Sequence, residues 1–223
     1  SEANESDMGD WGRSKLAEMY LTWYKPLGKS ENEMFVTAKA GRFTACPLPG
    51  LGARLAFSRP LALTTQANSQ NPYRAFNRQY GASAGFGYKG AFAEAGLLNG
   101  TGKLENSVEI GTDTYKDQFF NLEYGFGDLG SVVGVYYYHG KYRSDFSKPA
   151  TYKSPDRFSQ VGVFTDYAFD FAGMKGALIG AYVHGRNKYS TSAKANYKQR
   201  SEGYYAELQS HLYDGKLAPY FRW

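Results

Sequence analysis

The feature that most constrains this chain is a period of two in its apolar residues, repeated in segment after segment. Across 119–126 the apolar set occupies alternate positions, at Phe120, Leu122, Tyr124 and Phe126. Across 160–169 the same alternation recurs at Val161, Val163, Thr165, Tyr167 and Phe169. Such alternation gives a β-strand one apolar face and one mixed face. Ten segments of this kind lie near 15–25, 33–44, 81–88, 91–99, 117–126, 131–143, 157–170, 177–189, 201–212 and 217–223. We therefore predict an all-β chain that forms a single domain over 1–223.

The composition agrees with strands and excludes membrane-spanning helices. Aromatic residues make up 17% of the chain, yet its mean hydropathy is −0.54, because polar residues are interleaved with the apolar ones. No run of eighteen apolar residues occurs, which excludes a transmembrane helix. The one stretch with a helix-like pattern is 91–98, which we count among the strands. The single cysteine, Cys46, excludes a disulfide framework within the chain and a cysteine-rich metal site.

The connections between the segments alternate in length. Short turns are predicted at 25–32, 89–90, 127–130, 171–176 and 213–216. Long polar links are predicted at 44–80, 99–117, 144–157 and 190–202. This asymmetry is typical of antiparallel up-and-down transmembrane β-barrels of the outer membrane. Aromatic residues near strand ends, such as Trp23 and Tyr136 to Tyr138, fit the girdles of such barrels. A soluble β-sandwich or a lipocalin-like barrel is the alternative.

The direction of the strands predicts a barrel larger than ten strands. The first segment runs into a short turn and the last one leaves a short turn, so both outer ends lie on the side of the long links. In bacterial barrels both termini normally lie on the short-turn side. We therefore expect at least one further strand beyond each end, which makes twelve strands the minimum. A barrel of that width encloses water instead of being filled by side chains.

One stretch of the chain carries no negative charge. There is no Asp or Glu between Glu33 and Glu94, although seven basic residues lie there: Lys39, Arg42, Arg54, Arg59, Arg74, Arg78 and Lys89. Most of this stretch belongs to the link 44–80, whose length indicates a functional loop. The link has an apolar centre that includes Leu55 and Phe57, so we predict that it folds into the lumen and packs on the inner wall.

Positive charge in a confined channel attracts anions and repels cations. Arginine also binds phosphate and carboxylate groups through two parallel hydrogen bonds. We therefore predict an anion-attracting constriction built from Arg54, Arg59, Arg74 and Arg78, with Lys39 and Arg42 at the base of the loop. An alternative stays open, in which these arginines lie outside the barrel and pair with the phosphates of lipopolysaccharide.

The order of features around this stretch resembles the phosphate-selective porin family of Gram-negative outer membranes. Three stretches carry the resemblance: AKAGRFTACPLPG, LAFSRPLALTT and NRQYGASAGFGYKGAFAEAGLLNGTG. The matching positions are Gly41, Arg42, Phe43, Pro47, Pro49, Ser58, Arg59, Arg78, Gly81, Asn99 and Gly100. The resemblance covers roughly residues 33–143 and implies a sixteen-stranded, usually trimeric channel for anions, lined by basic residues. Cys46 departs from the pattern and no binding lysine can be matched by position, so the solute itself is not implied.

Two further patterns have simpler explanations than a cofactor site or a catalytic site. Gly85, Gly87 and Gly90 match G-x-G-x-x-G, but a dinucleotide site needs a buried strand before these glycines and a helix after them. The sequence instead predicts a hairpin that turns at Lys89–Gly90. The three histidines lie on separate strands and form no local catalytic motif: His139, His184 and His211. We predict no enzymatic activity, no metal, no cofactor and no nucleic-acid partner.

The predicted function is passive diffusion of small anionic solutes through an outer-membrane porin. The expected surroundings are membrane lipid and lipopolysaccharide, and the family resemblance implies a homotrimer. The alternative is a scaffold barrel that sheathes or docks another envelope protein, such as a multihaem electron carrier, without free flow of solute.

Overall fold

The structure is a computed structural model that describes residues 19–28, 33–45, 79–99, 116–142, 156–171, 174–189, 197–211 and 219–222. These residues form ten β-strands in one antiparallel sheet. The strands are β1 (Met19–Pro26), β2 (Met34–Phe43), β3 (Gln79–Tyr88), β4 (Ala91–Leu98), β5 (Asp117–Phe126), β6 (Ser131–Tyr142), β7 (Asp156–Phe171), β8 (Met174–Tyr189), β9 (Tyr197–His211) and β10 (Tyr220–Arg222). Each strand pairs with the next one along the chain. The predicted antiparallel up-and-down arrangement of ten strands is confirmed, and the helix-like stretch 91–98 is strand β4.

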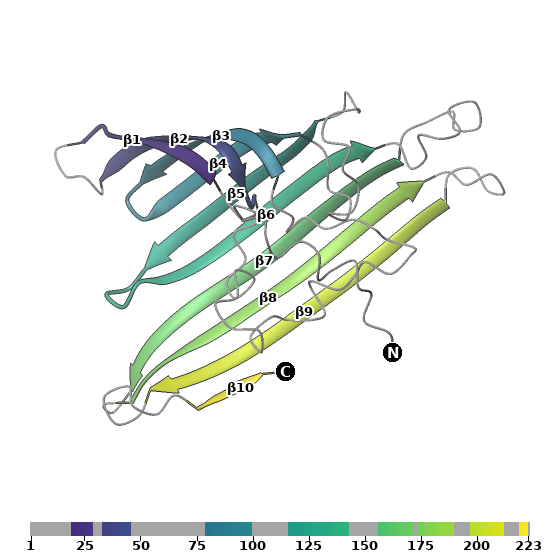
Figure 1. Cartoon of the computed structure of the whole chain (residues 1–223). Helices are drawn as coiled ribbons and strands as arrows, with labels where there is room; N and C mark the ends of the chain where they lie inside the picture. Colours follow the sequence, from purple (N-terminus) through teal and green to yellow (C-terminus); the bar gives the residue numbers. More distant parts are fainter. Residues whose placement is uncertain are drawn as a thin grey trace, which may run out of the picture.

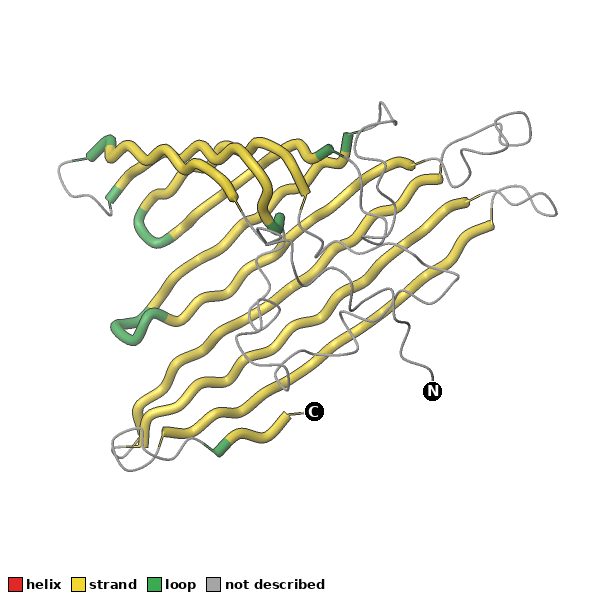
Figure 2. The backbone as a smooth tube through the Cα atoms, in the orientation of Figure 1, coloured by secondary structure: helices red, strands yellow, loops and turns green. Residues whose placement is uncertain are grey.

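The sheet is strongly curved, with β1 to β4 folded over the part formed by β5 to β9 (Figure 1). The backbone trace shows the same open arc (Figure 2). The sheet is not closed, because β1 pairs only with β2 and β10 pairs only with β9 among the described strands. In this described part of the chain, no helix is long and apolar enough to span a membrane.

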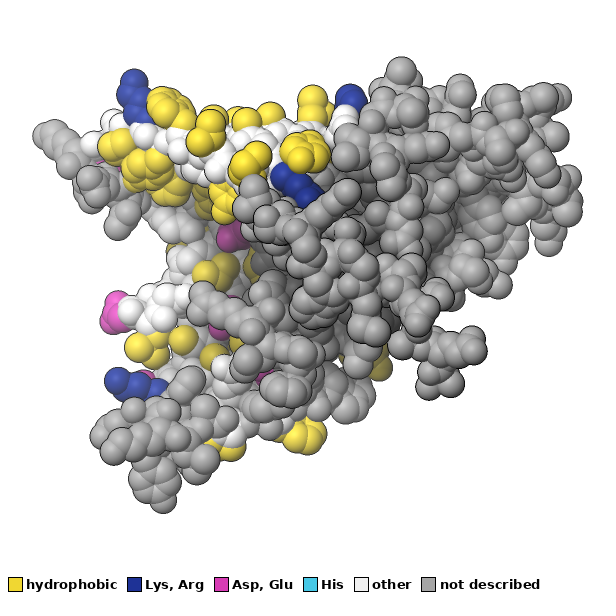
Figure 3. All heavy atoms as spheres, viewed as in Figure 1, with side chains coloured by type: hydrophobic (Ala, Val, Ile, Leu, Met, Phe, Trp, Pro, Cys, Tyr) yellow, Lys and Arg dark blue, Asp and Glu magenta, His cyan; other side chains and the backbone are white. Residues whose placement is uncertain are grey.

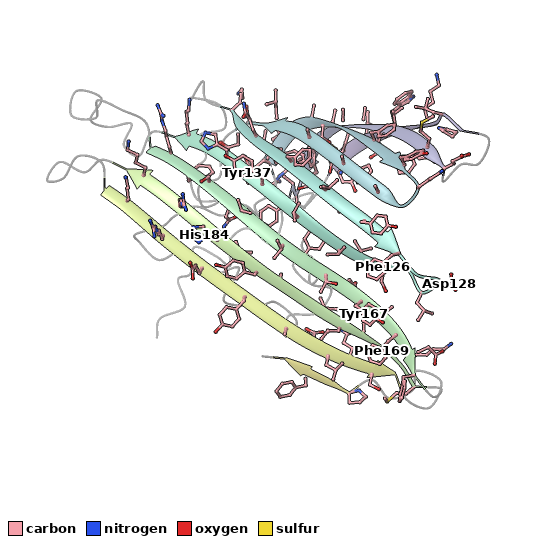
Figure 4. All side chains as sticks on the ribbon, turned by 180° about the vertical axis from the view of Figure 1, so that it is seen from behind. Phe126, Asp128, Tyr137, Tyr167, Phe169 and His184 are labelled. Atoms are coloured by element: carbon pink, nitrogen blue, oxygen red, sulfur yellow. The ribbon has the colours of Figure 1, made fainter. Side chains whose placement is uncertain are left out.

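The pairing register assigns each side chain to a convex face or a concave face. Residues paired across antiparallel strands point to the same side of the sheet, so each row of partners belongs to one face. A row that crosses the convex face consists of Leu122, Val135, Val163, Tyr182 and Tyr204. Every one of these apolar side chains is at least 39% exposed. Figure 4 shows the same face from behind, with Phe126, Tyr137 and Tyr167 on it. The structure therefore confirms the alternation predicted from 119–126 and 160–169.

The concave face is closely packed, because aromatic rings of one strand cover glycines of the next. The ring of Phe119 lies over Gly96, and the ring of Tyr136 lies over Gly162. A Cβ atom at Gly162 would come within 1.9 Å of the Tyr136 ring, so glycine leaves the room that the ring needs. Such pairs compensate for the missing side chain of a strand glycine and suit a curved sheet. The rings join a core of buried residues: Phe43, Ala45, Leu98, Phe119, Tyr136, Tyr138, Phe158, Phe164, Ala181 and Val183.

One expectation about which residues face outward is corrected by this core. Tyr136 and Tyr138 are 2% and 1% exposed on the concave face, and only Tyr137 between them is exposed on the convex face. The aromatic girdle predicted for this triplet is therefore wrong for two of its three rings. In β8 the apolar residues Ala181 and Val183 also point inward, because their small side chains fit into the packed wall.

The tightest connection joins β3 to β4 at Lys89–Gly90. The φ angles are 45° at Lys89 and 86° at Gly90. Two successive residues with positive φ are the mark of a type I′ turn, whose twist matches that of the strands it joins. Gly85 and Gly87 lie within β3, and the element after the turn is a strand. The predicted hairpin is confirmed, and the helix that a dinucleotide site requires does not follow these glycines.

Three strands are longer than the segments predicted for them at 157–170, 177–189 and 201–212. Strands β7 and β8 contain 16 residues each, and β9 contains 15. The predicted turn 171–176 is wrong in its second half, because 174–176 pairs with 169–171. The glycine that suggested a turn there, Gly176, is covered by the ring of Phe169. The predicted link 190–202 is wrong at its end, because 197–202 pairs with 184–189.

Candidate pore-lining surface

The candidate functional surface is the concave face, where polar side chains are buried in the wall. The polar residues on this face that are at most 8% exposed are Gln79, Ser83, Asp117, Asn121, Gln160 and Glu207. Burial of such groups is costly unless hydrogen bonds satisfy them, so their partners reveal how the wall is organised. Figure 3 looks into the hollow of the sheet, where acidic side chains lie between apolar and uncharged ones.

A polar cluster joins the four strands β2 to β5 around the carboxylate of Glu94. The ammonium of Lys39 lies 3.4 Å from Glu94 Oε1. The Ser83 hydroxyl donates a hydrogen bond of 2.6 Å to the same oxygen, and the Asn121 amide donates one of 3.4 Å to Oε2. Register brings these groups together, since Lys39 pairs with Ser83 and Glu94 pairs with Asn121 in the neighbouring row. The carboxylate thus holds three donors from three different strands.

Lys39 is also held by two aromatic rings. Its Nζ atom lies 5.5 Å from the centroid of the Tyr20 ring and 5.1 Å from that of Phe43. Contacts of this kind stabilise a cation by about 0.5–2 kcal/mol, depending on how far it is desolvated. The Lys39 side chain is 27% exposed, so it is a fixed positive charge at the surface of the concave face.

Arg42, the other predicted residue on β2, belongs to the opposite face. It pairs with Met19 on one side and with Tyr80 on the other, and both partners lie on the convex face. The structure therefore does not bring the Lys39 and Arg42 side chains together. The remaining predicted residues of the constriction lie outside the described residues: Arg54, Arg59, Arg74 and Arg78.

Both described ends of the long link are attached to the concave side of the sheet. At the first end, Ala45 is 4% exposed, and its carbonyl oxygen accepts a 2.9 Å hydrogen bond from the Asn121 amide. The ring of Phe43 contacts that of Phe119 edge to face, with 6.2 Å between the ring centroids. At the second end, the Gln79 side chain is 2% exposed and points into the wall. The chain thus leaves β2 and enters β3 on the side that faces the hollow.

The contact at Gln79 continues across the sheet as a chain of hydrogen bonds. The Gln79 amide donates to the hydroxyl of Tyr138 at 2.5 Å, and that hydroxyl donates to Asp117 Oδ2 at 2.7 Å. These three residues come from β3, β6 and β5, and none is more than 2% exposed. None of them was among the predicted site residues. Their signal was weak, because Tyr138 looked like a rim aromatic and Asp117 looked like the end of a polar link.

The described charges of the concave face are mostly acidic. Register places six acidic side chains on it: Glu94, Asp117, Glu123, Asp166, Asp170 and Glu207. Only two basic side chains that the structure describes share this face, Lys39 and Lys175. The wall itself therefore supplies an excess of negative charge. The net charge of the described wall is therefore opposite in sign to the net charge of the acid-free stretch. Most of that stretch lies in the link 44–80.

No family model, curated protein or solved structure matches this chain. Among the described residues, no three His, Cys, Asp or Glu side chains gather where they could hold a metal ion. Register places His139 and His184 on the convex face, away from the polar clusters of the wall. The side chain of His211 lies outside the described set.

Proposed function

We propose that this sheet is the wall of a closed transmembrane β-barrel, and that the barrel is a passive diffusion channel in a Gram-negative outer membrane. The observation that carries the proposal is the difference between the two faces. Row after row of apolar side chains is exposed on the convex face, while most of the buried polar side chains lie on the concave face. An exposed apolar surface spanning several strands is a liability in water. Barrels in a bilayer need an apolar outer band and a polar interior.

The two free edges support a closed form of the sheet. Within a bilayer every backbone N–H and C=O group must be paired, so an open edge is costly. Strands β1 and β10 each have one described partner. We propose that both edges are paired in the finished barrel. The resemblance to phosphate-selective porins would imply a barrel of sixteen strands.

Two opposed sources of charge would set the solute preference of this channel. The wall contributes an excess of carboxylates, several of which already accept hydrogen bonds from the wall. The link 44–80 contributes four arginines and no acid. We propose that the arginines outweigh the wall and give a preference for small anions such as phosphate-like or carboxylate solutes.

Recording from the native protein in a planar lipid bilayer tests both parts of the proposal. We expect steady single-channel conductance, with a reversal potential in a salt gradient that shows anion preference. Conductance with cation preference would contradict the role of the arginines. Inserted protein without conductance would contradict the channel and favour a scaffold barrel that holds a partner in its lumen.

A further inference from the structure

A second charged surface lies on the convex face, at the ends of β6 to β9 from which the long links leave. One register row there consists of four basic residues, Lys141, Arg157, Lys188 and Lys198. In the next row toward the middle of the strands, Arg186 pairs with Arg200. We call these six residues the basic cluster. Neither of the two rows contains an acidic residue on these four strands.

The charges of the basic cluster are available to a ligand. Five of its side chains are exposed and that of Lys141 is half-buried. Within the described residues, none of the six forms an ion pair with a carboxylate. The nearest acid along the strand, Glu202, instead binds His184, with 3.1 Å between Oε1 and Nδ1. Arg186 donates from Nε to the other nitrogen of the same ring at 3.2 Å. His184 is labelled at this end of the convex face in Figure 4.

This arrangement has an energetic cost in the absence of a ligand. Directly opposite residues of antiparallel strands have Cβ atoms about 5 Å apart, and like charges at that distance destabilise the pair. Arg186 faces Arg200, and Lys188 lies between Arg157 and Lys198. A bound group with several negative charges would offset this repulsion. Phosphate suits the cluster, since arginine donates two parallel hydrogen bonds to it and lysine adds a compact charge.

The surface next to the basic cluster indicates what else the ligand must contain. In the next row toward the middle of the strands, Tyr137 and Val161 are exposed on β6 and β7, beside His184 and Glu202 on β8 and β9. The row after it is apolar on all four strands, with Val135, Val163, Tyr182 and Tyr204 exposed by 39–55%. A ligand that covers both surfaces must carry phosphate at one end and hydrocarbon beside it. This is the chemistry of a phosphorylated membrane lipid, whereas free phosphate would leave the apolar side chains uncovered.

We propose that the basic cluster binds the phosphate groups of a membrane lipid, whose acyl chains lie on the exposed apolar side chains of β6 to β9 next to it. The inference rests on the proposed function in one respect, namely that the convex face contacts lipid. It does not depend on whether the lumen conducts. The bound lipid would belong to the membrane leaflet that surrounds the ends of the strands from which the long links leave.

The test is a titration of the native protein, folded in micelles of an uncharged detergent, with a diphosphorylated lipid A. The test variant carries Arg157→Gln, Lys188→Gln and Lys198→Gln, which are exposed neighbours in one row. The control variant carries Lys25→Gln, Lys89→Gln and Lys175→Gln, which removes the same charge at exposed positions near the short turns. Binding is measured by native mass spectrometry, with dephosphorylated lipid and inorganic phosphate as further arms.

We expect the test variant to lose affinity for lipid A on the order of 100-fold, while the control variant binds like the native protein. We also expect that the dephosphorylated lipid binds weakly and that millimolar inorganic phosphate does not compete. Equal affinity in both variants, or competition by inorganic phosphate alone, would overturn the lipid site. A native protein that folds only without detergent would overturn this site and the proposed barrel together. Lipid binding without bilayer conductance would remove the channel and leave the site intact.

Discussion

The ammonium of Lys39 lies 3.4 Å from the carboxylate of Glu94, across the intervening strand β3. Lys39 is the first basic residue of the acid-free stretch, and Glu94 is the acid that ends it. The pair therefore joins the first positive charge of a stretch that looks purely basic in sequence to a carboxylate of the concave wall. The local field at this point of the concave face depends on both residues.

Substitution Glu94→Gln removes the negative partner and leaves the charge of Lys39 in place. We expect the reversal potential of the channel to shift toward stronger anion preference, because the wall loses one carboxylate. Amide substitution keeps the size of the side chain and one of its acceptor oxygens. Glu202→Gln is the matched control, since Glu202 lies on the convex face and its charge is outside the lumen. A shift of the same size in both variants would contradict the assignment of the two faces.

The four arginines of the link are tested by changing all of them together, as Arg54→Gln, Arg59→Gln, Arg74→Gln and Arg78→Gln. Without them the described wall carries six acidic and two basic side chains, so we expect the preference to reverse toward cations. Substitution of the same four positions by lysine keeps the charge and is expected to keep the anion preference. Reversal potentials that stay unchanged in the glutamine variant would place these arginines outside the conduction path.

The hydrogen-bond chain at the second end of the link is tested by Tyr138→Phe. This change removes the hydroxyl that accepts from Gln79 and donates to Asp117, both of which are buried. Loss of a buried partner costs about 1–3 kcal/mol in the free energy of unfolding. Tyr137→Phe, one residue away on the exposed convex face, is the control and is expected to cost less than half as much. Urea unfolding in detergent, followed by tryptophan fluorescence, measures both.

The ring-over-glycine packing is tested by Gly162→Ala. The added Cβ atom would lie 1.9 Å from the ring of Tyr136, which is 2% exposed and donates a 3.2 Å hydrogen bond to Gln160. Because the ring is held on several sides, we expect a loss of about 1–3 kcal/mol in the free energy of unfolding. Gly125→Ala is the matched control on the same face, since the nearest atom to its new Cβ is 3.7 Å away. Equal stability of the two variants would show that the wall yields to the extra methyl group.

The number, order and direction of the strands could be predicted because the period of two survives in nearly every segment. The strand ends were less predictable. Gly176 and Lys175 have the composition of a turn, yet they belong to β8, where Phe169 covers the glycine and Asp170 lies opposite the lysine in the register. Such compensation comes from a neighbouring strand and leaves no local signal in the sequence.

The site was predicted only in part, for a similar reason. The concentration of positive charge between Glu33 and Glu94 is visible in the sequence. The ion pair between Lys39 and Glu94 is not, because the two residues are brought together only by the register of three strands. Lys39 and Arg42 are three positions apart on one strand, so alternation alone already puts them on opposite faces. Tyr136 and Tyr138 show the same effect, since a run of three tyrosines must divide between the faces.

The central claim is that the convex face contacts lipid and the concave face contacts water, and cysteine accessibility tests it most directly. In a Cys46→Ser background, single cysteines are placed at Leu122 and Tyr167 on the convex face, and at their neighbours Glu123 and Asp166 on the concave face. The protein is reconstituted into vesicles and treated with a water-soluble thiol reagent. We predict rapid labelling at positions 123 and 166, and protection from labelling at positions 122 and 167. We expect this protection to be lost when the protein is unfolded in the absence of detergent before the reagent is added. Labelling at 122 and 167 that is as fast as at 123 and 166 in the vesicles would contradict the account.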